Sequence, residues 1–315
     1  MIKKTDKIFL AGHKGLVGSA ILKLLKKKKY KKIVTVNKDK LDLFDQKKVL
    51  NYLKKNKPKI VIIAAAKVGG IKANNQFRAD FIRENLEIQN NLIHGSYINN
   101  IKNIIFLGSS CVYPKKSKQP IKEEYLLSGA LEETNEPYAV AKIAGIKMCE
   151  SYNRQYKTKY LCLMPSNTFG PGDNYNENNS HFISAILKKI YLSSLKKKSF
   201  LKLWGTGRPK REIIYVEDLA EAVVYFMNKK VKHTLINIGT SKDMTIKNYA
   251  KYILKILNIN LKIRFDRRNK FDGIKRKLLD ISRARKYGWK PKFDLKKAII
   301  ETYNDLKINY KHYRH

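Results

Sequence analysis

A glycine-rich turn near the start of the chain constrains the fold more than any other feature of the sequence. An apolar run over residues 7–11 leads directly into Gly12, and Gly15 and Gly18 follow before a helix-length stretch. Glycines at these places allow a tight turn, let backbone N–H groups approach a pyrophosphate at the helix N-terminus, and let the helix pack closely on a sheet. The placement predicts a strand, loop and helix that bind a dinucleotide.

Short β-branched runs alternate with helix-length stretches through the first half of the chain. The runs are continuously apolar, which is typical of strands in a parallel sheet whose two faces are both covered. We expect strands at residues 7–11, 33–37, 60–64, 104–107 and 160–164. We expect helices at residues 17–28, 46–55, 77–99 and 138–156. This alternation predicts an α/β protein with a Rossmann-type, doubly wound parallel sheet.

A tyrosine and a lysine four residues apart form a second candidate site. In Tyr138-Ala-Val-Ala-Lys142 the two side chains lie one helical turn apart, so the ammonium would lower the pKa of the phenol and make it a usable proton donor. Ser109 follows the fourth expected strand, and its hydroxyl could hold a carbonyl oxygen near that phenol. Such a spacing also arises by chance on any lysine-rich helix, so its context decides its meaning.

The chain is strongly basic, with a net charge of +41 from 67 Lys and Arg against 26 Asp and Glu. The lysines are spread along the whole chain, without a long basic tail or a cluster interleaved with aromatic residues. We therefore interpret lysine as the default surface residue and expect no nucleic-acid partner. A diffuse positive field still favours anionic small molecules.

Cysteine and histidine usage points to a protein without disulfides or metal. Cys111, Cys149 and Cys162 are odd in number and form no C-x-x-C pair, which fits a reducing cytoplasm. The six histidines show no metal-ligand spacing. The N-terminus has no signal-peptide pattern, and the longest apolar runs are far too short to span a membrane, so we expect a soluble, cytoplasmic protein with no membrane partner.

Several motifs together identify a family. The glycine loop, S-S-C-V-Y-P from Ser109 and Y-x-x-x-K resemble the extended short-chain dehydrogenase/reductase family of nucleotide-sugar enzymes. The other motifs resemble one branch of it, the NADPH-dependent 3,5-epimerase-4-reductases that act on GDP-4-keto-6-deoxymannose. These motifs cover nearly the whole chain and include A-A-K-V-G-G-I-x-A-N, P-S-N-T-F-G-P-G-D-N-Y, N-S-H-F-I, W-G-T-G-x-P-x-R-E and D-G-x-x-R-K-L-L-D.

The resemblance implies a division of the chain near Pro165. Residues 1–165 would form an NADP-binding Rossmann domain that carries the Ser/Tyr/Lys triad. The turn-rich stretch over residues 165–174 would return over the active site. Residues 166–315 would form mainly a smaller α/β domain that binds a GDP-linked 4-keto-6-deoxy sugar, with some segments returning to the Rossmann sheet.

The resemblance also implies catalytic roles. Ser109, Tyr138 and Lys142 would be the reductase triad, in which Tyr138 protonates the 4-keto oxygen and Lys142 also holds the nicotinamide ribose. Cys111 and His181 would be the acid/base pair that inverts carbons 3 and 5, because protons beside a ketone are acidic enough for a thiolate or an imidazole to remove. Read from the residues alone, Cys111 is a buried strand-end cysteine and His181 a polar residue at a helix start.

Two sets of binding residues follow from the same resemblance. The cofactor contacts would be Gly12, His13, Lys14, Gly15, Leu16, Val17, Gly18, Lys38, Leu107, Gly108, Ser109, Ser110, Lys142, Pro165, Ser166, Asn167, Thr168 and His181. The substrate contacts would be Lys189, Trp204, Arg211 and Asp272, with Lys277 as a further diphosphate contact. The family often has arginine where this chain has Lys14 and Lys189, which keeps the charge but loses the fork geometry of a guanidinium.

The end of the second expected strand favours NADP over NAD. An NAD site of this type usually presents an acidic residue there to the ribose 2′-hydroxyl. Here the tip is Asn37 followed by Lys38, and Lys14 lies in the glycine loop, so two cations suit a 2′-phosphate. Asp39 and the general abundance of lysine weigh against this interpretation.

We also expect a homodimer. Related enzymes pair the Tyr/Lys helix and the helix before it into a four-helix bundle across a two-fold axis. Phe81, Leu86, Leu92 and Ile93 would offer the apolar surface for that contact.

Two other functions stay open on the sequence. Another nucleotide-sugar enzyme, such as a 4-epimerase with tightly held NAD, shares the glycine loop and the Tyr/Lys pair but does not need Cys111 and His181. A non-catalytic binding module on the same fold is the second. An intact Ser109, Tyr138 and Lys142 set argues against a dead enzyme.

Overall fold

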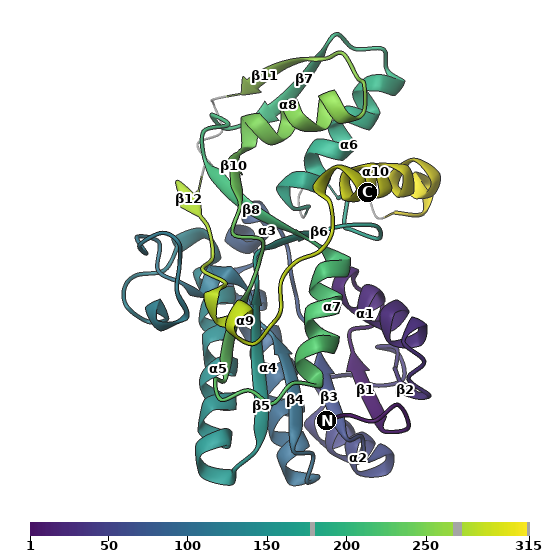
Figure 1. Cartoon of the computed structure of the whole chain (residues 1–315), viewed down its shortest axis with the longest axis vertical. Coiled ribbons are helices and arrows are strands. Elements are labelled where there is room, and N and C mark those ends of the chain that lie inside the picture. The colour runs from purple at the N-terminus through teal and green to yellow at the C-terminus, as the bar shows by residue number, and fades with distance from the viewer. Residues whose placement is uncertain (177–179, 267–272, 314–315) are drawn as a thin grey trace.

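A parallel sheet with packed helices forms the lower part of the molecule in Figure 1. The computed structural model describes residues 1–176, 180–266 and 273–313. The strands of this sheet are β1 (Lys7–Ala11), β2 (Lys32–Val34), β3 (Ile60–Ile63), β4 (Asn103–Leu107), β5 (Lys159–Pro165) and β9 (Leu235–Ile238). They lie in the order β2-β1-β3-β4-β5-β9, and every neighbouring pair is parallel.

The order of the strands places a ligand crevice above β1. Because β1 has β2 on one side and β3 on the other, the direction of winding reverses there, and open α/β sheets bind ligands at such a point, outside the carboxyl ends of the strands. Apart from a polar first residue in β1, β2, β4 and β5 and Asn237 in β9, the strands are apolar, and no residue of β3 is more than 2% exposed. The predicted Rossmann-type fold is therefore confirmed.

The helices of the lower part fall into two packing groups. Helix α1 packs on α7, while α4 packs on both α2 and α5 (Figure 1). These helices are α1 (Leu16–Lys27), α2 (Gln46–Asn56), α4 (Arg78–Ile98), α5 (Glu136–Tyr156) and α7 (Val216–Met227). Shorter turns connect them, namely α3 (Ile71–Gln76), η1 (Ser110–Val112), η2 (Glu123–Tyr125), η3 (Glu133–Asn135) and α9 (Ser282–Lys286).

The upper part of the molecule has its own core and its own small sheets. Strand β8 lies between β10 and β12 and also pairs with β6, while β7 pairs with β11. The strands are β6 (Asn167–Phe169), β7 (Phe200–Trp204), β8 (Lys210–Tyr215), β10 (Asp243–Thr245), β11 (Lys262–Asp266) and β12 (Arg276–Lys277). The helices are α6 (Phe182–Leu195), α8 (Ile246–Ile256), α10 (Leu295–Asn309) and the single turn η4 (Tyr310–His312).

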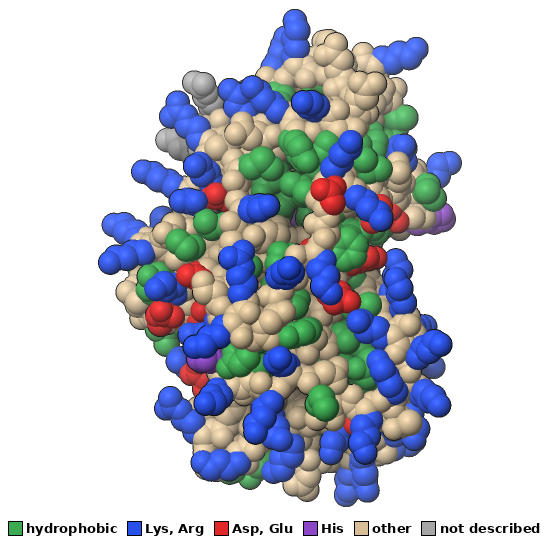
Figure 2. Space-filling model, viewed as in Figure 1, with side chains coloured by type: hydrophobic (Ala, Val, Ile, Leu, Met, Phe, Trp, Pro, Cys, Tyr) green, Lys and Arg blue, Asp and Glu red, His purple; other side chains and the backbone are tan. Residues whose placement is uncertain are grey.

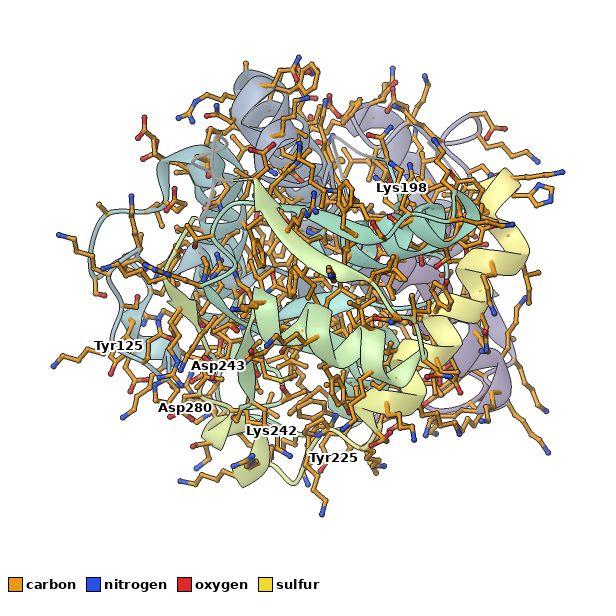
Figure 3. The ribbon with its side chains drawn as sticks, turned by 90° about the horizontal axis from the view of Figure 1, so that it is seen from above. Tyr125, Lys198, Tyr225, Lys242, Asp243 and Asp280 are labelled. Atoms are coloured by element: carbon orange, nitrogen blue, oxygen red, sulfur yellow. The ribbon has the colours of Figure 1, made fainter. Side chains whose placement is uncertain are left out.

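Segments from the second half of the chain return to the lower part. Strand β9 closes one edge of the large sheet, and α7 covers α1. Leu279, Ile281 and Trp289 also belong to the core beneath the large sheet. Seen from above, Asp243 of β10 and Asp280, which follows β12, lie on the same side of the molecule (Figure 3).

Two expectations about these elements need correction. The second strand ends at Val34 rather than near Asn37, because the carbonyl of Asn37 accepts the backbone N–H groups of Lys40 and Leu41 and so forms a turn. Phe81, Leu92 and Ile93 do not offer surface to a partner, since all three are at most 2% exposed within the subunit. The remaining strands and helices lie within a few residues of their predicted positions.

Positive charge is scattered over the surface. Figure 2 shows Lys and Arg side chains over both the upper and the lower part of one face, with few acidic side chains between them. Among the described residues no helix is both long and apolar enough to cross a membrane. Within the same residues no group of three or more His, Cys, Asp or Glu side chains could hold a metal ion.

Candidate active site

The turn between β1 and α1 has the shape that a pyrophosphate requires. Gly12 has a φ of +89°, and a Cβ atom there would lie 2.5 Å from the backbone nitrogen of Ala65. A Cβ atom at Gly18 would overlap the carbonyl oxygen of Gly12, so only glycine lets α1 begin this close to the turn. Gly15 is the N-cap of α1 and makes no side-chain cap. The first N–H groups of α1 therefore fit the anionic centre of a dinucleotide.

The two lysines proposed for the adenosine end are both exposed. Lys14 lies in the glycine turn, and Lys38 lies in the turn after β2, next to β1 in the sheet. The Lys38 ammonium is 5.2 Å from the centroid of the Phe44 ring. Asp39 is exposed as well, so this end of the site presents both signs of charge.

Ser109 and Cys111 stand directly beyond the carboxyl end of β4. Ser109 is the N-cap of the 3₁₀ turn η1, and its Oγ accepts the backbone N–H of Cys111 at 3.4 Å. Cys111 is 6% exposed. Burial raises the pKa of its thiol, while the positive charges of Lys277 and Lys142 and the hydroxyl of Ser109 act to lower it. Desolvation is the largest of these influences, so the neutral thiol is favoured at rest, while the two lysines and the Ser109 hydroxyl stabilise a thiolate when it forms.

Tyr138 and Lys142 lie on one face of α5, beside the end of β4. The Lys142 ammonium is 5.8 Å from the centroid of the Tyr138 ring and 4.7 Å from that of Phe106. It donates a hydrogen bond of 3.1 Å to the carbonyl oxygen of Leu107. Lys142 is 2% exposed, and burial lowers its pKa to about 8. The Tyr138 ring is fixed from the other side by an edge contact with Phe81, at 6.3 Å between centroids.

The expected pKa of Tyr138 is wrong in direction. Burial, with a further contribution from the negative charge of a Cys111 thiolate, raises the pKa of the phenol instead of lowering it. The reason is that the Lys142 ammonium points to the Leu107 carbonyl and the Phe106 ring, so desolvation of the phenol dominates. Tyr138 therefore holds its proton at neutral pH, which suits a proton donor.

The segment after β5 lies close to the same edge of the sheet. Asn167 donates from Nδ2 to the carbonyl of Glu212, and the Thr168 hydroxyl donates to the carbonyl of Ser166. The Ser166 side chain is buried, and its Oγ has no hydrogen-bond partner. An orphaned buried hydroxyl at this position fits the nicotinamide end of a dinucleotide, because a carboxamide supplies the missing partner.

His181 lies in the upper part of the molecule, directly before α6. It is the exposed N-cap residue of α6, and its side chain makes no capping hydrogen bond. Among the described residues no hydrogen bond joins His181 to Cys111. The prediction that His181 is a polar residue at a helix start is correct as local structure. Because the imidazole does not cap the helix, it is available for proton transfer.

The proposed substrate contacts form two groups, one on β8 and β12 and one between α6 and β7. Lys277 lies beside Arg211 in the register of these two parallel strands. Burial lowers the pKa of Lys277. The charge of Cys111 acts to raise this pKa and that of Arg211 acts to lower it, so Lys277 interacts with both groups. The Lys189 ammonium stands 4.6 Å from the Trp204 ring, which is 48% exposed and free to stack. Asp272 lies outside the described residues.

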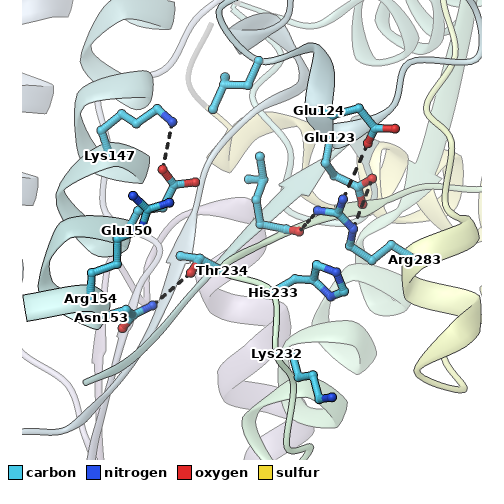
Figure 4. Close-up of a pocket in the computed structure, with 12 residues that line it drawn as sticks. Glu123, Glu124, Lys147, Glu150, Asn153, Arg154, Lys232, His233, Thr234 and Arg283 are labelled. Carbon is cyan, nitrogen blue, oxygen red and sulfur yellow. Dashed lines mark hydrogen bonds and ion pairs between the residues drawn. The ribbon is translucent and has the colours of Figure 1, made fainter. Parts of the chain in front are cut away.

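A groove of about 510 Å³ lies away from these residues, at the outer edge of β9. Its lining includes Glu123, Arg283 and Leu235, and Figure 4 shows Glu123 and Glu124 next to the guanidinium. Arg283 donates from Nη1 to the carbonyl of Leu235 at 2.9 Å, while Oε1 of Glu123 accepts the backbone N–H of Asn237 at 2.9 Å. Glu123 and Arg283 also form an ion pair at 3.7 Å. These side chains occupy the edge where a further strand would pair.

A family model covers most of the chain. Residues 8–239 match the model described as the NAD dependent epimerase/dehydratase family. The chain belongs to this family. A nicotinamide dinucleotide is accordingly the class of cofactor that the turn before α1 accommodates, and the chain is an oxidoreductase/epimerase.

Named relatives match the chain over nearly its whole length. It is 42% identical over 307 residues to the GDP-L-fucose synthase of Escherichia coli (strain K12), covering 95% of each chain. It is 41% identical over 298 residues to the GDP-L-colitose synthase of Yersinia pseudotuberculosis, covering 94% of this chain and 96% of the relative. Among solved structures, an NADP-bound GDP-L-fucose synthetase from Naegleria fowleri superposes with a TM-score of 0.91 at 27% identity, over 100% of this chain and 96% of the other.

Two residues near the site received no role from the sequence. Gln89 of α4 donates from Nε2 to the carbonyl of Ala141, between Tyr138 and Lys142. Asp173 lies buried near the start of α6. Asp173 stands inside the motif P-S-N-T-F-G-P-G-D-N-Y, which was a usable signal, whereas nothing in the sequence marks Gln89, because its partner is a backbone carbonyl.

Proposed function

We propose that the chain is a GDP-L-fucose synthase, which inverts carbons 3 and 5 of GDP-4-keto-6-deoxymannose and then reduces carbon 4. One observation carries this assignment. Cys111, in the turn directly after β4, and Tyr138 and Lys142 of α5 meet at the carboxyl end of β4, where Lys142 donates to the carbonyl of Leu107. A base for carbon acids therefore shares one site with a proton donor for a ketone. The named relatives support the same assignment.

The first stage is proton transfer at carbons 3 and 5. The Cys111 thiolate takes a proton from the carbon beside the ketone, and the electron pair moves onto the 4-keto oxygen. Ser109 and Tyr138 stabilise that enolate through their hydroxyl groups. His181 then gives a proton to the opposite face of the carbon, which inverts it. Each inversion leaves a neutral thiol and a neutral imidazole, and exchange with solvent restores both groups.

The second stage is reduction of carbon 4. When bound, the dinucleotide supplies the hydride for this carbon. Tyr138 transfers its phenolic proton to the oxygen that was the ketone, so the sugar leaves as an alcohol. The phenolate that remains is stabilised by the Lys142 ammonium on the same face of α5. At neutral pH Tyr138 holds its proton, and Lys142, with its pKa lowered to about 8, still carries its charge, so both groups are in the form that this step needs.

We propose NADP as the cofactor, held by the turn between β1 and α1 and by Lys14 and Lys38. The solved relative with bound NADP supports this choice, as do two exposed ammonium groups near the expected ribose. Residues 1–165 would bind the cofactor. Residues 166–315 would bind mainly the sugar nucleotide, with Arg211 and Lys277 on its diphosphate and Trp204 on its base.

The synthesis of GDP-L-colitose is the second candidate. The relative named GDP-L-colitose synthase favours it, because its identity to this chain is almost the same as that of the fucose enzymes. The two candidates share the cofactor turn and the Tyr/Lys pair, so only the sugar product separates them.

Incubation with NADPH and GDP-4-keto-6-deoxymannose tests the proposal. We expect NADPH oxidation that depends on this sugar nucleotide, and GDP-L-fucose as the product identified by NMR. Oxidation that yields a 4-hydroxy sugar with uninverted carbons 3 and 5 would exclude the epimerase half. No oxidation with this substrate, in a protein that binds NADPH, would exclude the assignment.

Cys111→Ser tests the epimerase half directly. We expect exchange of solvent deuterium into carbons 3 and 5 to fall by about a hundredfold, because a serine hydroxyl is a far weaker base than a thiolate at neutral pH. Binding of NADPH should not change. A serine variant that makes GDP-L-fucose at the wild-type rate would show that Cys111 only packs in the site.

We further propose a cytoplasmic homodimer without a nucleic-acid partner. The buried Phe81, Leu92 and Ile93 cannot carry the contact, but Val140 of α5 and Ile98 of α4 are 39% and 52% exposed. These helices also pack extensively on each other, so they offer one rigid surface. Sedimentation at micromolar concentration tests this, and a purely monomeric species would contradict it.

A further inference from the structure

A buried carboxylate lies behind His181, at the N-terminus of α6. Asp173 is 4% exposed, and its Oδ2 accepts a short hydrogen bond from the Oγ of Ser184, which is fully buried. Its Oδ1 accepts the backbone N–H of Asn174 at 2.7 Å. A carboxylate this deeply buried requires such partners, because an unpaired charge would be costly.

Asp173 anchors the first turn of α6 through a side-chain contact rather than as a backbone cap. His181 is the N-cap, with φ −75° and ψ 162°, yet its side chain makes no capping hydrogen bond. Ser184 is the third residue of the helix, and it binds Asp173 through its side-chain hydroxyl and not through the backbone N–H that a capping residue would accept. The carboxylate from another segment thus anchors the first turn, where the helix dipole favours an anion. The imidazole of His181 remains available for proton transfer.

The charge of Asp173 also reaches His181. Burial raises the pKa of the Asp173 carboxyl, and the positive charge of His181 is the largest influence that lowers it, followed by the hydrogen bond from Ser184. Attraction between two such groups is mutual. The carboxylate therefore both fixes the backbone that carries His181 and interacts with its imidazolium form.

The C-terminal helix holds the loop that carries Asp173. The backbone N–H of Gly172 donates to Oδ2 of Asp305 at 3.0 Å and to the hydroxyl of Tyr313 at 3.1 Å. The Tyr313 hydroxyl also donates to Asp305, and its ring lies 5.0 Å from that of the buried Tyr175. The loop is thus fixed on both sides of Asp173.

We propose that Asp173 is a positioning residue for His181, which fixes where the imidazole meets the sugar. The inference rests on the proposed epimerase function, because it assigns a supporting residue to the proton donor of that reaction. Asp173 does not touch the substrate itself. The alternative is that Asp173 only stabilises the fold of the loop and of α6.

The product distribution separates these two roles. With Asp173→Asn, which has the same shape but no charge, we expect solvent deuterium exchange to slow by about tenfold to a hundredfold. Reduction by the intact Ser109, Tyr138 and Lys142 should continue. More of the ketone is then reduced before inversion, so the share of product with uninverted carbons should rise. A purely structural lesion lowers total turnover and leaves that share unchanged.

Two further variants complete the design. Ser184→Ala keeps the carboxylate and removes one anchor, so we expect a smaller change in the same direction. In a His181→Asn background, Asp173→Asn should add nothing to the loss of exchange, because both residues act through one imidazole. Additive losses in the double variant would overturn the proposal. So would an Asp173→Asn protein that has the wild-type Tm and the wild-type product ratio.

Wild-type enzyme assayed in parallel distinguishes this failure from failure of the proposed function. If the wild-type chain makes no inverted product from GDP-4-keto-6-deoxymannose, the proposed function is wrong, and the role proposed for Asp173 is wrong as well. If the wild-type chain inverts the sugar while Asp173→Asn inverts it equally well, only the role of Asp173 is wrong. Should Asp173→Asn fail to fold, Ser184→Ala in the same His181→Asn background gives the decisive comparison.

Discussion

The lower and upper parts of the molecule assemble their shares of the site in different ways. The lower part supplies Ser109, Cys111, Tyr138 and Lys142 from one stretch of chain that leaves β4 and returns along α5. The upper part supplies its groups from elements spread over residues 181–277. Strand β12, for example, reaches Arg211 only by pairing with β8 from far along the chain.

This difference teaches how the work is divided. Catalysis needs a few side chains fixed at short distances from one another. A strand end that faces one helix provides them from neighbouring parts of the chain, so their positions depend little on contacts with distant segments. Recognition of a long nucleotide sugar needs groups spread over a wide surface, which small sheets built from distant segments provide. We therefore expect changes in the lower part to affect kcat and changes in the upper part to affect KM.

The largest expected effect is that of Tyr138→Phe. This change removes the proton donor for carbon 4, so NADPH oxidation should fall by about a hundredfold or more. Exchange of solvent deuterium into the sugar should continue at a reduced rate, because Cys111 and His181 are intact while one of the two hydroxyl groups that stabilise the enolate is lost. Stopped-flow absorbance and NMR measure the two reactions separately. Loss of both reactions together would show that the two chemistries cannot be separated in this site.

Arg211→Ala should show the opposite pattern. A guanidinium that clamps a diphosphate contributes to ground-state and transition-state binding alike, so we expect KM for the sugar nucleotide to rise by about tenfold to a hundredfold, with kcat changed only a few-fold. Arg211→Lys serves as the matched control and should recover part of the affinity, since it keeps the charge without the fork. A fall in kcat at unchanged KM would break the proposed division between the two parts.

The pH dependence belongs to the lower part. Burial lowers the pKa of Lys142 to about 8, so the side chain carries its proton below that pH and loses it above. The ammonium must be present to stabilise the phenolate of Tyr138, and the reduction rate should therefore fall as the pH rises, by about tenfold at one pH unit above that pKa. Lys142→Arg, which stays charged, should be slower but lack this decline. An unchanged rate for the wild-type protein up to pH 9.5 would contradict it.

The smallest expected effect is that of Lys14→Ala. An exposed ammonium beside a 2′-phosphate contributes only modestly, so we expect a loss of about twofold to fivefold in kcat/KM with NADPH and little change with NADH. Lys40→Ala, another exposed lysine in the turn after β2, is the control. Equal efficiency of the wild-type chain with both cofactors would remove the argument for NADP from these lysines.

The sequence predicts the lower part well for a physical reason. Continuous apolar runs, a glycine turn and a Tyr/Lys spacing are local features, and each is interpretable without knowledge of distant contacts. The two-residue strand β12 has no such pattern, because its existence depends on β8. The direction in which the pKa of Tyr138 is shifted could not be predicted from the sequence either, because it depends on burial and on where the Lys142 ammonium points.

The same limit explains Asp173 and the dimer surface. An aspartate in a turn-rich motif looks like a turn residue until the first turn of α6 is placed over it. Phe81 and Leu92 look like spare apolar surface until Tyr138 and the core cover them. Amphipathic patterns show that a residue is covered, but not whether its own chain or another chain covers it.

The side chains at the outer edge of β9 have a consequence for how the protein behaves when it is concentrated. The outermost strand of an open sheet invites a strand from another molecule, and long stacks of such pairs become insoluble. Here the outward carbonyl of Leu235 and the outward N–H of Asn237 are already taken by Arg283 and Glu123. The two side chains therefore block hydrogen bonds that another strand would need in order to pair with this edge. A strand from another molecule would have to displace both side chains before it could pair with β9 at these positions.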